Sequence, residues 1–136
     1  VVHPDIALVL DTACWSKNFD FGNANHRQIG AGPMLVLYDK TLIAPPKLTA
    51  LIEKVARPLG IPLQKDMFSN GGTDGGAVHL SGTGVPTVVL GPPTRHGHCA
   101  ASIADETDID HTHQLLVALT ASMNRETVAH LTDFRC

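Results

Sequence analysis

Asp5-Ile-Ala-Leu-Val-Leu-Asp11 carries the clearest structural signal in this sequence. It is an unbroken apolar run bounded by two acidic residues, which is typical of a parallel strand covered on both faces. Residues 34–37 and 87–90 repeat the pattern, each after a Gly or Pro that interrupts the preceding segment. The three runs predict three buried strands. Residues 61–68 are more polar and include Pro62, so we expect that segment near an edge of the sheet.

A helix is predicted between the second and third of these strands. Large apolar residues recur at helical spacing over residues 48–59, directly after Pro45-Pro46, a pair that suits the first turn of a helix. Pro58 and Gly60 then predict where the helix ends, because neither residue continues a helix well.

A second apolar stripe predicts a closing helix, and its members are Leu115, Leu116, Leu119 and Met123. Asp108 or Asp110 is the candidate N-cap of this helix. Residues 75–80 predict a short helix capped by Thr73 or Asp74. The alternation of strands and helices predicts an α/β fold with a mainly parallel sheet and helices on both faces.

The composition fits one domain over residues 1–136 and excludes several functions. Apolar residues make up 43% of the chain and charged residues 17%, so the chain should pack rather than stay disordered. A net charge of −3 with scattered Lys and Arg, together with 4% aromatic residues, disfavours nucleic-acid binding. The longest run of bulky apolar residues, 6–10, is far too short to cross a membrane.

The cysteines and the first residue bear on cellular context. Three cysteines without a CxxC pair favour reduced thiols, and the cytoplasm is therefore the expected compartment. The chain starts at Val1 and runs almost at once into the first predicted strand. We therefore expect it to be part of a longer protein.

The ends of two predicted strands bring metal-ligand types to one edge of the sheet. In open α/β sheets, ligands bind beyond the carboxyl ends of the strands. Asp11 is the first charged residue after its strand, and a loop over residues 91–99 with His96 and His98 follows another strand. Carboxylate and imidazole are ligands that zinc, cobalt and manganese accept. The pattern therefore predicts a divalent metal site.

Each of these residues also has an ordinary interpretation. An Asp after a strand is commonly a turn or cap residue, and a loop His commonly makes only a hydrogen bond. Cys99 is expected to be buried and inert. A zinc site made by Asp11, Cys14, His98 and Cys99 is conceivable, although no spacing motif supports it. Three further histidines are expected on the surface: His111, His113 and His130.

Five motifs that follow one another along the chain resemble those of one protein family. They are Leu10-Asp11-Thr12, the segment over residues 32–48, Gly71-Gly-Thr-Asp74, Gly84-Val-Pro86 and Pro93-Thr-Arg-His-Gly-His98-Cys99. In this order they resemble the C-terminal part of the glutamyl aminopeptidase family, cocatalytic metallopeptidases that assemble as tetrahedral particles and are often mislabelled endoglucanases. The resemblance spans nearly the whole chain and is strongest to Frv-type and Sgc-type bacterial members. It implies the C-terminal part of a zinc-peptidase-like α/β/α catalytic domain.

By this resemblance, Asp11 corresponds to the terminal carboxylate ligand of one metal ion and His98 to the imidazole ligand of the other. The bridging Asp, a Glu-Glu pair that includes the general base, and a further His would lie before Val1. Such a metal pair lowers the pKa of a bound water and polarises the scissile carbonyl. The chain alone is therefore expected to lack peptidase activity and to bind metal weakly or not at all. Three other glutamates are expected to be solvated surface charges: Glu53, Glu106 and Glu126.

The same resemblance offers candidates for the substrate pocket, namely Gly71, Gly72, Thr73, Asp74, Arg95 and His96. The first four match a loop beside the active site, although a helix-start turn explains them equally well. The last two flank the ligand loop. Family members carry Tyr where this chain has His96, which leaves a substrate contact at that position open.

Three functions are weighed on these grounds. The leading hypothesis is a metal-dependent aminopeptidase that removes N-terminal residues from peptides with two divalent ions, zinc or cobalt with manganese as a third candidate. The resemblance implies a homo-oligomer, a dodecamer in the full-length family. The alternative is a non-catalytic assembly or binding module that keeps the fold. A glycoside hydrolase needs two carboxylic acids flanking a sugar, and only Asp11 lies at the predicted crevice.

Overall fold

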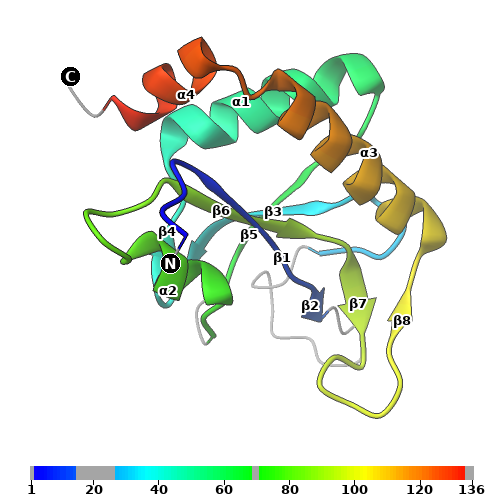
Figure 1. Cartoon of the computed structure of the whole chain (residues 1–136). Helices are drawn as coiled ribbons and strands as arrows, with labels where there is room; N and C mark the ends of the chain where they lie inside the picture. The colour runs from blue at the N-terminus through cyan, green and yellow to red at the C-terminus, as the bar shows by residue number, and fades with distance from the viewer. Residues whose placement is uncertain (1, 15–26, 69–70, 134–136) are drawn as a thin grey trace.

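The computed structural model describes residues 2–14, 27–68 and 71–133, which Figure 1 colours from blue near the N-terminus to red near the C-terminus. The strands are β1 (Ala7–Leu10), β2 (Ala13–Cys14), β3 (Met34–Asp39), β4 (Leu42–Ile43), β5 (Gln64–Met67), β6 (Thr87–Gly91), β7 (Pro93–Arg95) and β8 (Ile103–Ala104). The helices are α1 (Pro46–Ala56), the 3-10 turn η2 (Arg57–Leu59), α2 (Asp74–His79), α3 (Glu106–Ser122) and α4 (Arg125–Thr132). The predicted α/β class is confirmed.

The main sheet is mixed rather than mainly parallel. Its strand order is β1-β6-β3-β4, and β5 pairs with β3. β1 is parallel to β6, and β3 is parallel to β5. β3 runs antiparallel to β6, however, with Met34 opposite Gly91, and it forms an antiparallel hairpin with β4. The mainly parallel arrangement is not confirmed, because an apolar run identifies a strand but does not fix its direction.

A second, smaller sheet with the order β2-β7-β8 continues from two strands of the main sheet. β2 follows β1 and β7 follows β6, and β2 is parallel to β7 as β1 is to β6. β8 returns antiparallel to β7 and leads into α3. The segments that follow β1 and β6 therefore lie side by side beyond one edge of the main sheet.

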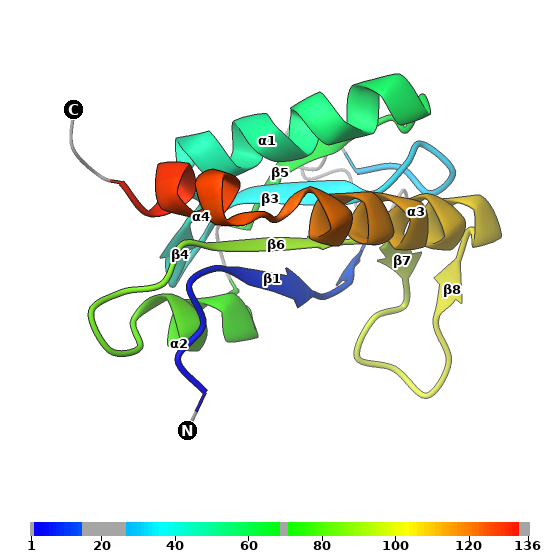
Figure 2. The same cartoon turned by 45° about the horizontal axis from the view of Figure 1, so that its top comes forward.

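Helices lie on both faces of the main sheet, as expected. α1, α3 and α4 are on one face and α2 is on the other (Figure 2). Val88 and Leu90 of β6 belong to a large apolar cluster that includes residues of α1 and α3. Val89 points the other way and packs with Val36 and Leu42 in a smaller cluster. The alternation of side chains along β6 thus builds one core on each face.

The predicted strand positions hold, with one difference at β1. All residues of β6 and residues 34–36 of β3 are buried, and β5 is at an edge as expected, since β3 is the described strand with which it pairs. β1 was also expected to be covered on both faces. It is instead the last strand of the order, and the side chain of Leu10 is 58% exposed.

α1 forms as the sequence predicts. Pro46 is its first residue and Pro45 its N-cap, a place where a missing N–H costs no helical hydrogen bond. The helix ends at Ala56, and the following 3-10 turn closes on Gly60, whose φ of +68° lies in the left-handed region. Among the described residues, no helix combines the length and the apolar character needed to cross a membrane.

The start of α3 corrects the predicted N-cap. Asp105 is the cap, and its carboxylate accepts a hydrogen bond from the N–H of Thr107 at 2.8 Å. Asp108 lies in the first turn instead, 1% exposed, and accepts the N–H groups of Gly30 and Gly32, each at 2.7 Å. Asp105 and Asp108 are both residue types that cap helices. The contact of Asp108 with the loop at residues 30–32 determines which of them is the cap. A separate last helix, α4, was not predicted.

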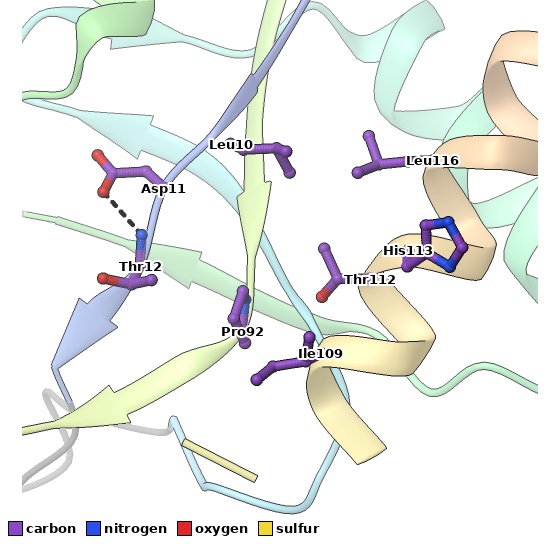
Figure 3. A pocket seen from close by; sticks show the side chains of 8 residues that line it. All are labelled: Leu10, Asp11, Thr12, Pro92, Ile109, Thr112, His113 and Leu116. Atoms are coloured by element: carbon purple, nitrogen blue, oxygen red, sulfur yellow. Dashed lines mark hydrogen bonds between the residues drawn. The ribbon is translucent and has the colours of Figure 1, made fainter. Parts of the chain in front are cut away.

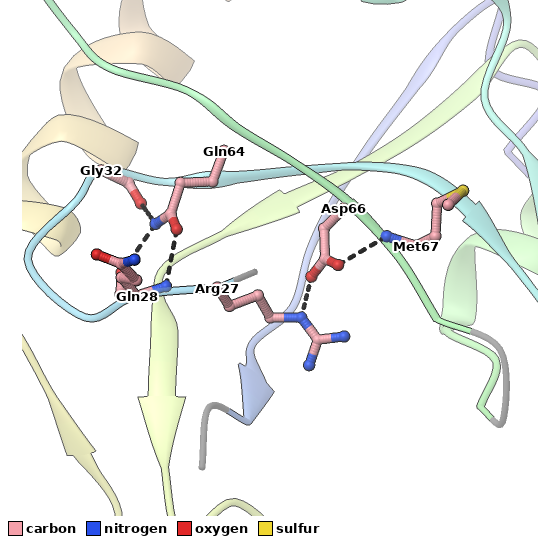
Figure 4. Close-up of polar contacts among 6 residues, drawn as sticks. All are labelled: Arg27, Gln28, Gly32, Gln64, Asp66 and Met67. Carbon is pink, nitrogen blue, oxygen red and sulfur yellow. Dashed lines mark hydrogen bonds and ion pairs between the residues drawn. The ribbon is translucent and has the colours of Figure 1, made fainter. Parts of the chain in front are cut away.

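The polar side chains of β5 hold the loop that precedes β3 (Figure 4). The amide of Gln64 accepts the N–H of Gln28 at 2.8 Å and donates to the carbonyl oxygens of Gln28 and Gly32. Asp66 is 8% exposed and pairs with the guanidinium of Arg27. This edge strand is thus tied by its side chains to a neighbouring segment.

Candidate functional site

Asp11 lies where β1 ends, beside the end of β6. Its N–H donates to the carbonyl of Leu90 at 3.2 Å, which extends the β1–β6 ladder by one residue. Its side chain is exposed, and the carboxylate accepts the N–H of Thr12 at 2.7 Å. The second carboxylate oxygen points away from Thr12 (Figure 3). Asp11 therefore makes a local hydrogen bond to the backbone and presents an exposed carboxylate just after β1.

A glycine allows the two strands to meet closely at this edge. A Cβ atom added at Gly91 would lie 1.7 Å from the backbone carbonyl oxygen of Asp11. No side chain fits at that distance, since real Cβ contacts do not come below 3.0 Å. Gly91 thus fixes the position of the Asp11 backbone relative to β6.

The loop between β7 and β8 carries the predicted imidazole ligand. His98 is exposed and has a φ of +60°, and His96 is exposed with a φ of +56°. A left-handed backbone at two non-glycine residues is uncommon and costs conformational energy. The carbonyl of His96 accepts the hydroxyl of Ser102 at 3.0 Å across the loop, and Arg95 at the end of β7 is half-buried.

Two residues of this region differ from expectation. Cys99 was expected to be buried but is an exposed free thiol, because it lies at the tip of the β7–β8 loop rather than under it. The side chain of Cys14 lies outside the described part of the structure, so the four-ligand zinc alternative stays a prediction.

A groove of about 470 Å³ runs between the end of β1 and α3, and it is lined by Leu10, Asp11, Thr12, Pro92, Ile109, Thr112, His113 and Leu116. Figure 3 shows that Leu10 points into it toward α3, whereas the carboxylate of Asp11 points to the other side of β1. The imidazole at this groove belongs to His113, not to His98. His113 was expected on the surface, and it is exposed; the helical spacing of Ile109, His113 and Leu116 is the signal that could have placed it here.

Asp11 at the end of β1 and His98 in the β7–β8 loop have the right chemistry for a divalent ion, but they do not form a complete site. Asp11 offers a carboxylate and His98 an imidazole, which zinc and cobalt accept. Among the side chains that the structure describes, which do not include that of Cys14, no three His, Cys, Asp or Glu residues come together to hold a metal ion. A metal centre here would need ligands beyond those that this part of the chain supplies.

Glu106 and Glu126 are surface charges as expected, whereas Glu53 is half-buried and paired with a lysine. Glu53 forms an ion pair with Lys65 at 2.8 Å, on the side of α1 that faces β5. Glu106 and Glu126 are exposed in the first turns of α3 and α4. There an acidic side chain interacts favourably with the helix dipole. These roles are structural.

The Gly71–Asp74 stretch lies beside Asp39, near the ends of the strands that are opposite to the Asp11 end. Because β3 runs antiparallel to β6, its last residue lies far from Gly91 and close to the start of α2. The carboxylate of Asp39 accepts both the N–H and the hydroxyl of Thr73, at 3.1 and 2.7 Å. It also accepts the N–H and hydroxyl of Thr41 at 2.6 and 2.8 Å.

Asp39 accepts all four of these hydrogen bonds, and the sequence analysis did not identify it. Burial on its own would raise the pKa of Asp39, which is 1% exposed. The hydrogen bonds from Thr73 and Thr41 outweigh burial and hold the pKa below its ordinary value of 3.8. Thr73 is the N-cap residue of α2 as predicted, but its hydroxyl bonds to Asp39 and does not cap the helix. The interpretation of this stretch as the start of a helix is confirmed. A substrate contact by these residues stays a prediction.

Two further glycines let α2 approach the sheet. A Cβ at Gly75 would lie 2.7 Å from Cγ2 of Val89, and one at Gly76 would lie 2.1 Å from the hydroxyl oxygen of Thr41. Both glycines are buried. The Gly-rich sequence here therefore serves helix–sheet packing.

The sequence profile of the M42 glutamyl aminopeptidases matches residues 1–115 of the chain. The putative aminopeptidase FrvX of Escherichia coli is 31% identical over 98% of this chain, and the glutamyl aminopeptidase of Lactococcus lactis subsp. cremoris is 30% identical over 97%. The chain spans only 38% and 36% of these two relatives.

Solved structures show the same fold. The crystal structure of a TET aminopeptidase from a marine sediment archaeon, Thaumarchaeota archaeon SCGC AB-539-E09, superimposes with a TM-score of 0.89 at 34% identity. The superposition covers 95% of this chain and 36% of that protein. With a profile match over most of its length and a shared architecture, the chain belongs to the M42 glutamyl aminopeptidase family.

Proposed function

We propose that this chain is the part of a metal-dependent aminopeptidase that supplies one ligand to each of two divalent ions, the carboxylate of Asp11 and the imidazole of His98. The observation that carries the proposal is the paired ladder β1–β6 and β2–β7, which brings the segment after Asp11 alongside the segment that leads to His98. The close contact at Gly91 supports it, because it holds the Asp11 backbone in one place.

Each residue has a defined part in this proposal. The N–H of Thr12 orients the Asp11 carboxylate and leaves one oxygen for a metal ion. The left-handed backbone at His98 presents an exposed imidazole at the tip of the loop. The ions would be zinc or cobalt, with manganese as a third candidate. Since the described residues do not form a complete site, the isolated chain would bind them weakly or not at all.

The proposed substrates are peptides, from which N-terminal residues are removed. Candidate contacts near the ligand loop are Arg95 and His96, at the end of β7 and just beyond it. The residues Gly71, Gly72, Thr73 and Asp74 remain candidates through the family resemblance, and their position beside Asp39 sets them apart from the Asp11 edge.

The proposed setting is the cytoplasm, in a homo-oligomer that the family resemblance implies to be a dodecamer. The exposed free thiol of Cys99 supports a reducing compartment. The apolar side chains of Leu10 and Ile109, which are 58% and 48% exposed, support burial against further polypeptide.

Activity measurements test the proposal in two steps. The purified chain, supplied with cobalt or zinc, is expected not to cleave an aminoacyl anilide; cleavage that EDTA abolishes would contradict the incomplete-site interpretation. The chain is then joined to the part of FrvX that it does not match, and the hybrid is expected to cleave the same substrate.

Substitutions in that hybrid identify the ligands. Asp11→Asn and His98→Ala should each lower metal affinity at least about 100-fold, since even residues that only support ligands change affinity by about 10- to 100-fold. Asp5→Asn and His130→Ala, at exposed positions away from this edge, are the matched controls and should leave affinity unchanged. Full metal affinity in either ligand variant would exclude that residue as a ligand.

A non-catalytic assembly or binding module is the second candidate. It is favoured by the absence, within the described residues, of any group of three metal-binding side chains. A hybrid that folds but neither binds metal nor cleaves the anilide would support this module and contradict the aminopeptidase proposal.

A further inference from the structure

We propose that Ser102 is a positioning residue, whose hydroxyl holds the loop between β7 and β8 in the conformation that presents the imidazole of His98. The inference rests on the proposed function, because it concerns how one of the proposed metal ligands is held. It adds a residue that acts through His98 and does not bind a metal ion itself.

The loop that carries His98 projects from the rest of the structure. Figures 1 and 2 show the segment between β7 and β8 extending beyond the helices and the main sheet. Residues 96–102 are all exposed apart from Gly97, which is half-buried. Because so little of this loop is buried, side-chain packing does not fix its shape, and its conformation depends on local hydrogen bonds and backbone preferences.

Backbone preferences alone do not favour the conformation of this loop. His96 and His98 have φ values of +56° and +60°, both in the left-handed region. Residues other than glycine enter this region at a cost in conformational energy, and they stay there only where surrounding contacts determine the backbone. Two such residues, separated by Gly97 alone, therefore require a contact that selects this conformation over the more common ones.

The side chain of Ser102 supplies such a contact. Its hydroxyl donates a hydrogen bond to the carbonyl oxygen of His96 at 3.0 Å. Because the peptide group is planar, a hydrogen bond to this carbonyl also orients the peptide bond that leads to Gly97. The Ser102 hydroxyl thus constrains the backbone at the first left-handed residue, two positions before His98.

The register of the β7–β8 hairpin explains why Ser102 reaches His96. Thr94 lies opposite Ala104, and Arg95 lies opposite Ile103. Continuing this register by one position places His96 opposite Ser102. The hydroxyl therefore adds a hydrogen bond just beyond the last paired residues, and residues 97–101 are left as the closed loop. A shorter loop has fewer conformations available to it.

Both partners of this hydrogen bond follow or precede an anchored strand. His96 follows β7, which is the central strand of the small sheet and pairs with both β2 and β8. Ser102 precedes β8, which leads to Asp105, the N-cap residue of α3. The Ser102 hydroxyl is therefore attached to a fixed element, and its hydrogen bond can hold the loop instead of moving with it.

Substitution of Ser102 tests its effect on metal binding. In the hybrid with the remaining part of FrvX, Ser102→Ala should weaken cobalt binding about tenfold, because one hydrogen bond changes a conformational population by about that factor and apparent affinity falls with the population that can bind. Ser102→Thr keeps the hydroxyl and should stay within about twofold of the natural affinity. Ser81→Ala is the matched control, since Ser81 is an exposed serine whose hydroxyl donates to the carbonyl of Val78 at 2.8 Å in a different loop. It should leave cobalt affinity unchanged.

A double substitution shows whether Ser102 acts through His98. Substitutions at independent sites have additive effects on free energy, whereas coupled ones do not. Once His98→Ala has removed the imidazole, Ser102→Ala should therefore cause no further loss of cobalt affinity. A general structural role of Ser102 would weaken cobalt binding equally in both backgrounds.

NMR spectroscopy of the metal-free 136-residue chain tests the loop conformation directly. Backbone chemical shifts depend on φ and ψ, so they report whether His96 and His98 are left-handed. We expect left-handed values in the natural chain, in Ser102→Thr and in Ser81→Ala, and a change toward averaged values in Ser102→Ala. Circular dichroism melts of each variant check that the rest of the fold is retained. This measurement needs neither the hybrid nor a metal ion.

The outcomes separate this inference from the proposed function. If His98→Ala loses cobalt affinity and Ser102→Ala does not, the positioning role is overturned and the proposed function stands. If His98→Ala keeps full affinity, the proposed function is contradicted, and the positioning role with it. An effect of Ser102→Ala that persists in the His98→Ala background, or left-handed shifts that persist in the Ser102→Ala chain, would also overturn the inference.

Discussion

At the scale of single residues, the predicted metal site at the end of β1 depends on how closely the backbone of Asp11 passes β6. Gly91 makes that approach possible, because any larger residue would place its Cβ against the Asp11 carbonyl oxygen. The carboxylate itself is then oriented by the N–H of the next residue, Thr12. Position and orientation thus come from backbone contacts, which are stiffer than contacts between long side chains.

Gly91→Ala is expected to destabilise the chain by about 3 kcal/mol or more, since forcing atoms into a packed interior costs roughly 1–3 kcal/mol and here the clash is with backbone. Gly71→Ala is the matched control, because a Cβ at Gly71 meets nothing within 4 Å. Urea unfolding of both variants measures the difference. Equal stabilities would show that β1 can move away from β6 without cost.

Asp39 gives the chain a defined response to acid. Its pKa is lower in the folded state than its ordinary value of 3.8, so the carboxylate stabilises the fold at pH values above 3.8 and loses this contribution as the pH falls through the folded pKa. Asp39→Asn should therefore lower the melting temperature at pH 7, and the difference from the natural chain should shrink below pH 4.

Circular dichroism melts between pH 7 and pH 3 check this expectation. Asp5→Asn is the control, because Asp5 is exposed and the variant should match the natural chain throughout. A difference between Asp39→Asn and the natural chain that stays the same at every pH would contradict a role for the ionised carboxylate.

At the scale of elements, the first turn of α3 organises a distant loop as well as its own helix. Asp105 caps the helix, and Asp108 reaches back to the N–H groups of Gly30 and Gly32. The turn before β3 is therefore anchored to a helix that comes more than seventy residues later in the sequence. The Gln64 amide anchors the same turn from β5.

Asp108→Ala should destabilise the chain by about 2–4 kcal/mol, because it leaves two backbone donors, one of them buried, without a partner. Asp110→Ala is the matched control, since Asp110 is exposed in the same turn of the helix and should cost less than about 0.5 kcal/mol. Thermal unfolding measures both. If the two variants were equally stable, the contact with the 30–32 turn would not contribute.

The elements also show how far the sequence can be interpreted. Local signals predicted α1 with its two prolines, the short α2, the buried β3 and β6, and the edge position of β5, because each depends on neighbours in sequence. They could not predict the direction of β3 or the choice between Asp105 and Asp108, because those depend on contacts between distant segments.

The candidate site follows the same division. The strand ends predicted that the segments after β1 and β6 lie close together, and the parallel β2–β7 pair confirms that these segments adjoin. That Asp11 and His98 act together stays a prediction. The cluster around Asp39 could not be anticipated, because its residues converge only when β3 runs antiparallel to β6. Helical spacing places Ile109 and His113 on one face of α3, but it does not show that this face borders the end of β1.

At the scale of the whole molecule, one apolar cluster joins both long helices to the sheet. Leu115 of α3 is 0% exposed within it, as are Ile52 of α1 and Leu90 of β6. Leu115→Ala should lower the free energy of unfolding by about 3 kcal/mol, within the range of about 2–5 kcal/mol for such truncations. Val117→Ala, at a 55% exposed position of the same helix, should change it by less than about 0.5 kcal/mol. Chemical denaturation compares the two, and a similar cost for both would contradict a shared core.

The pairing of β1 with β6 has a consequence for synthesis of the chain. Ala7 meets its partner Thr87 only after all the residues between them in the sequence have been made. Forming contacts between residues so distant in sequence requires closure of a long loop before any gain from pairing, which slows folding. During synthesis, the apolar residues of β1 lack their β6 partners until β6 follows, and transiently uncovered apolar surface favours aggregation.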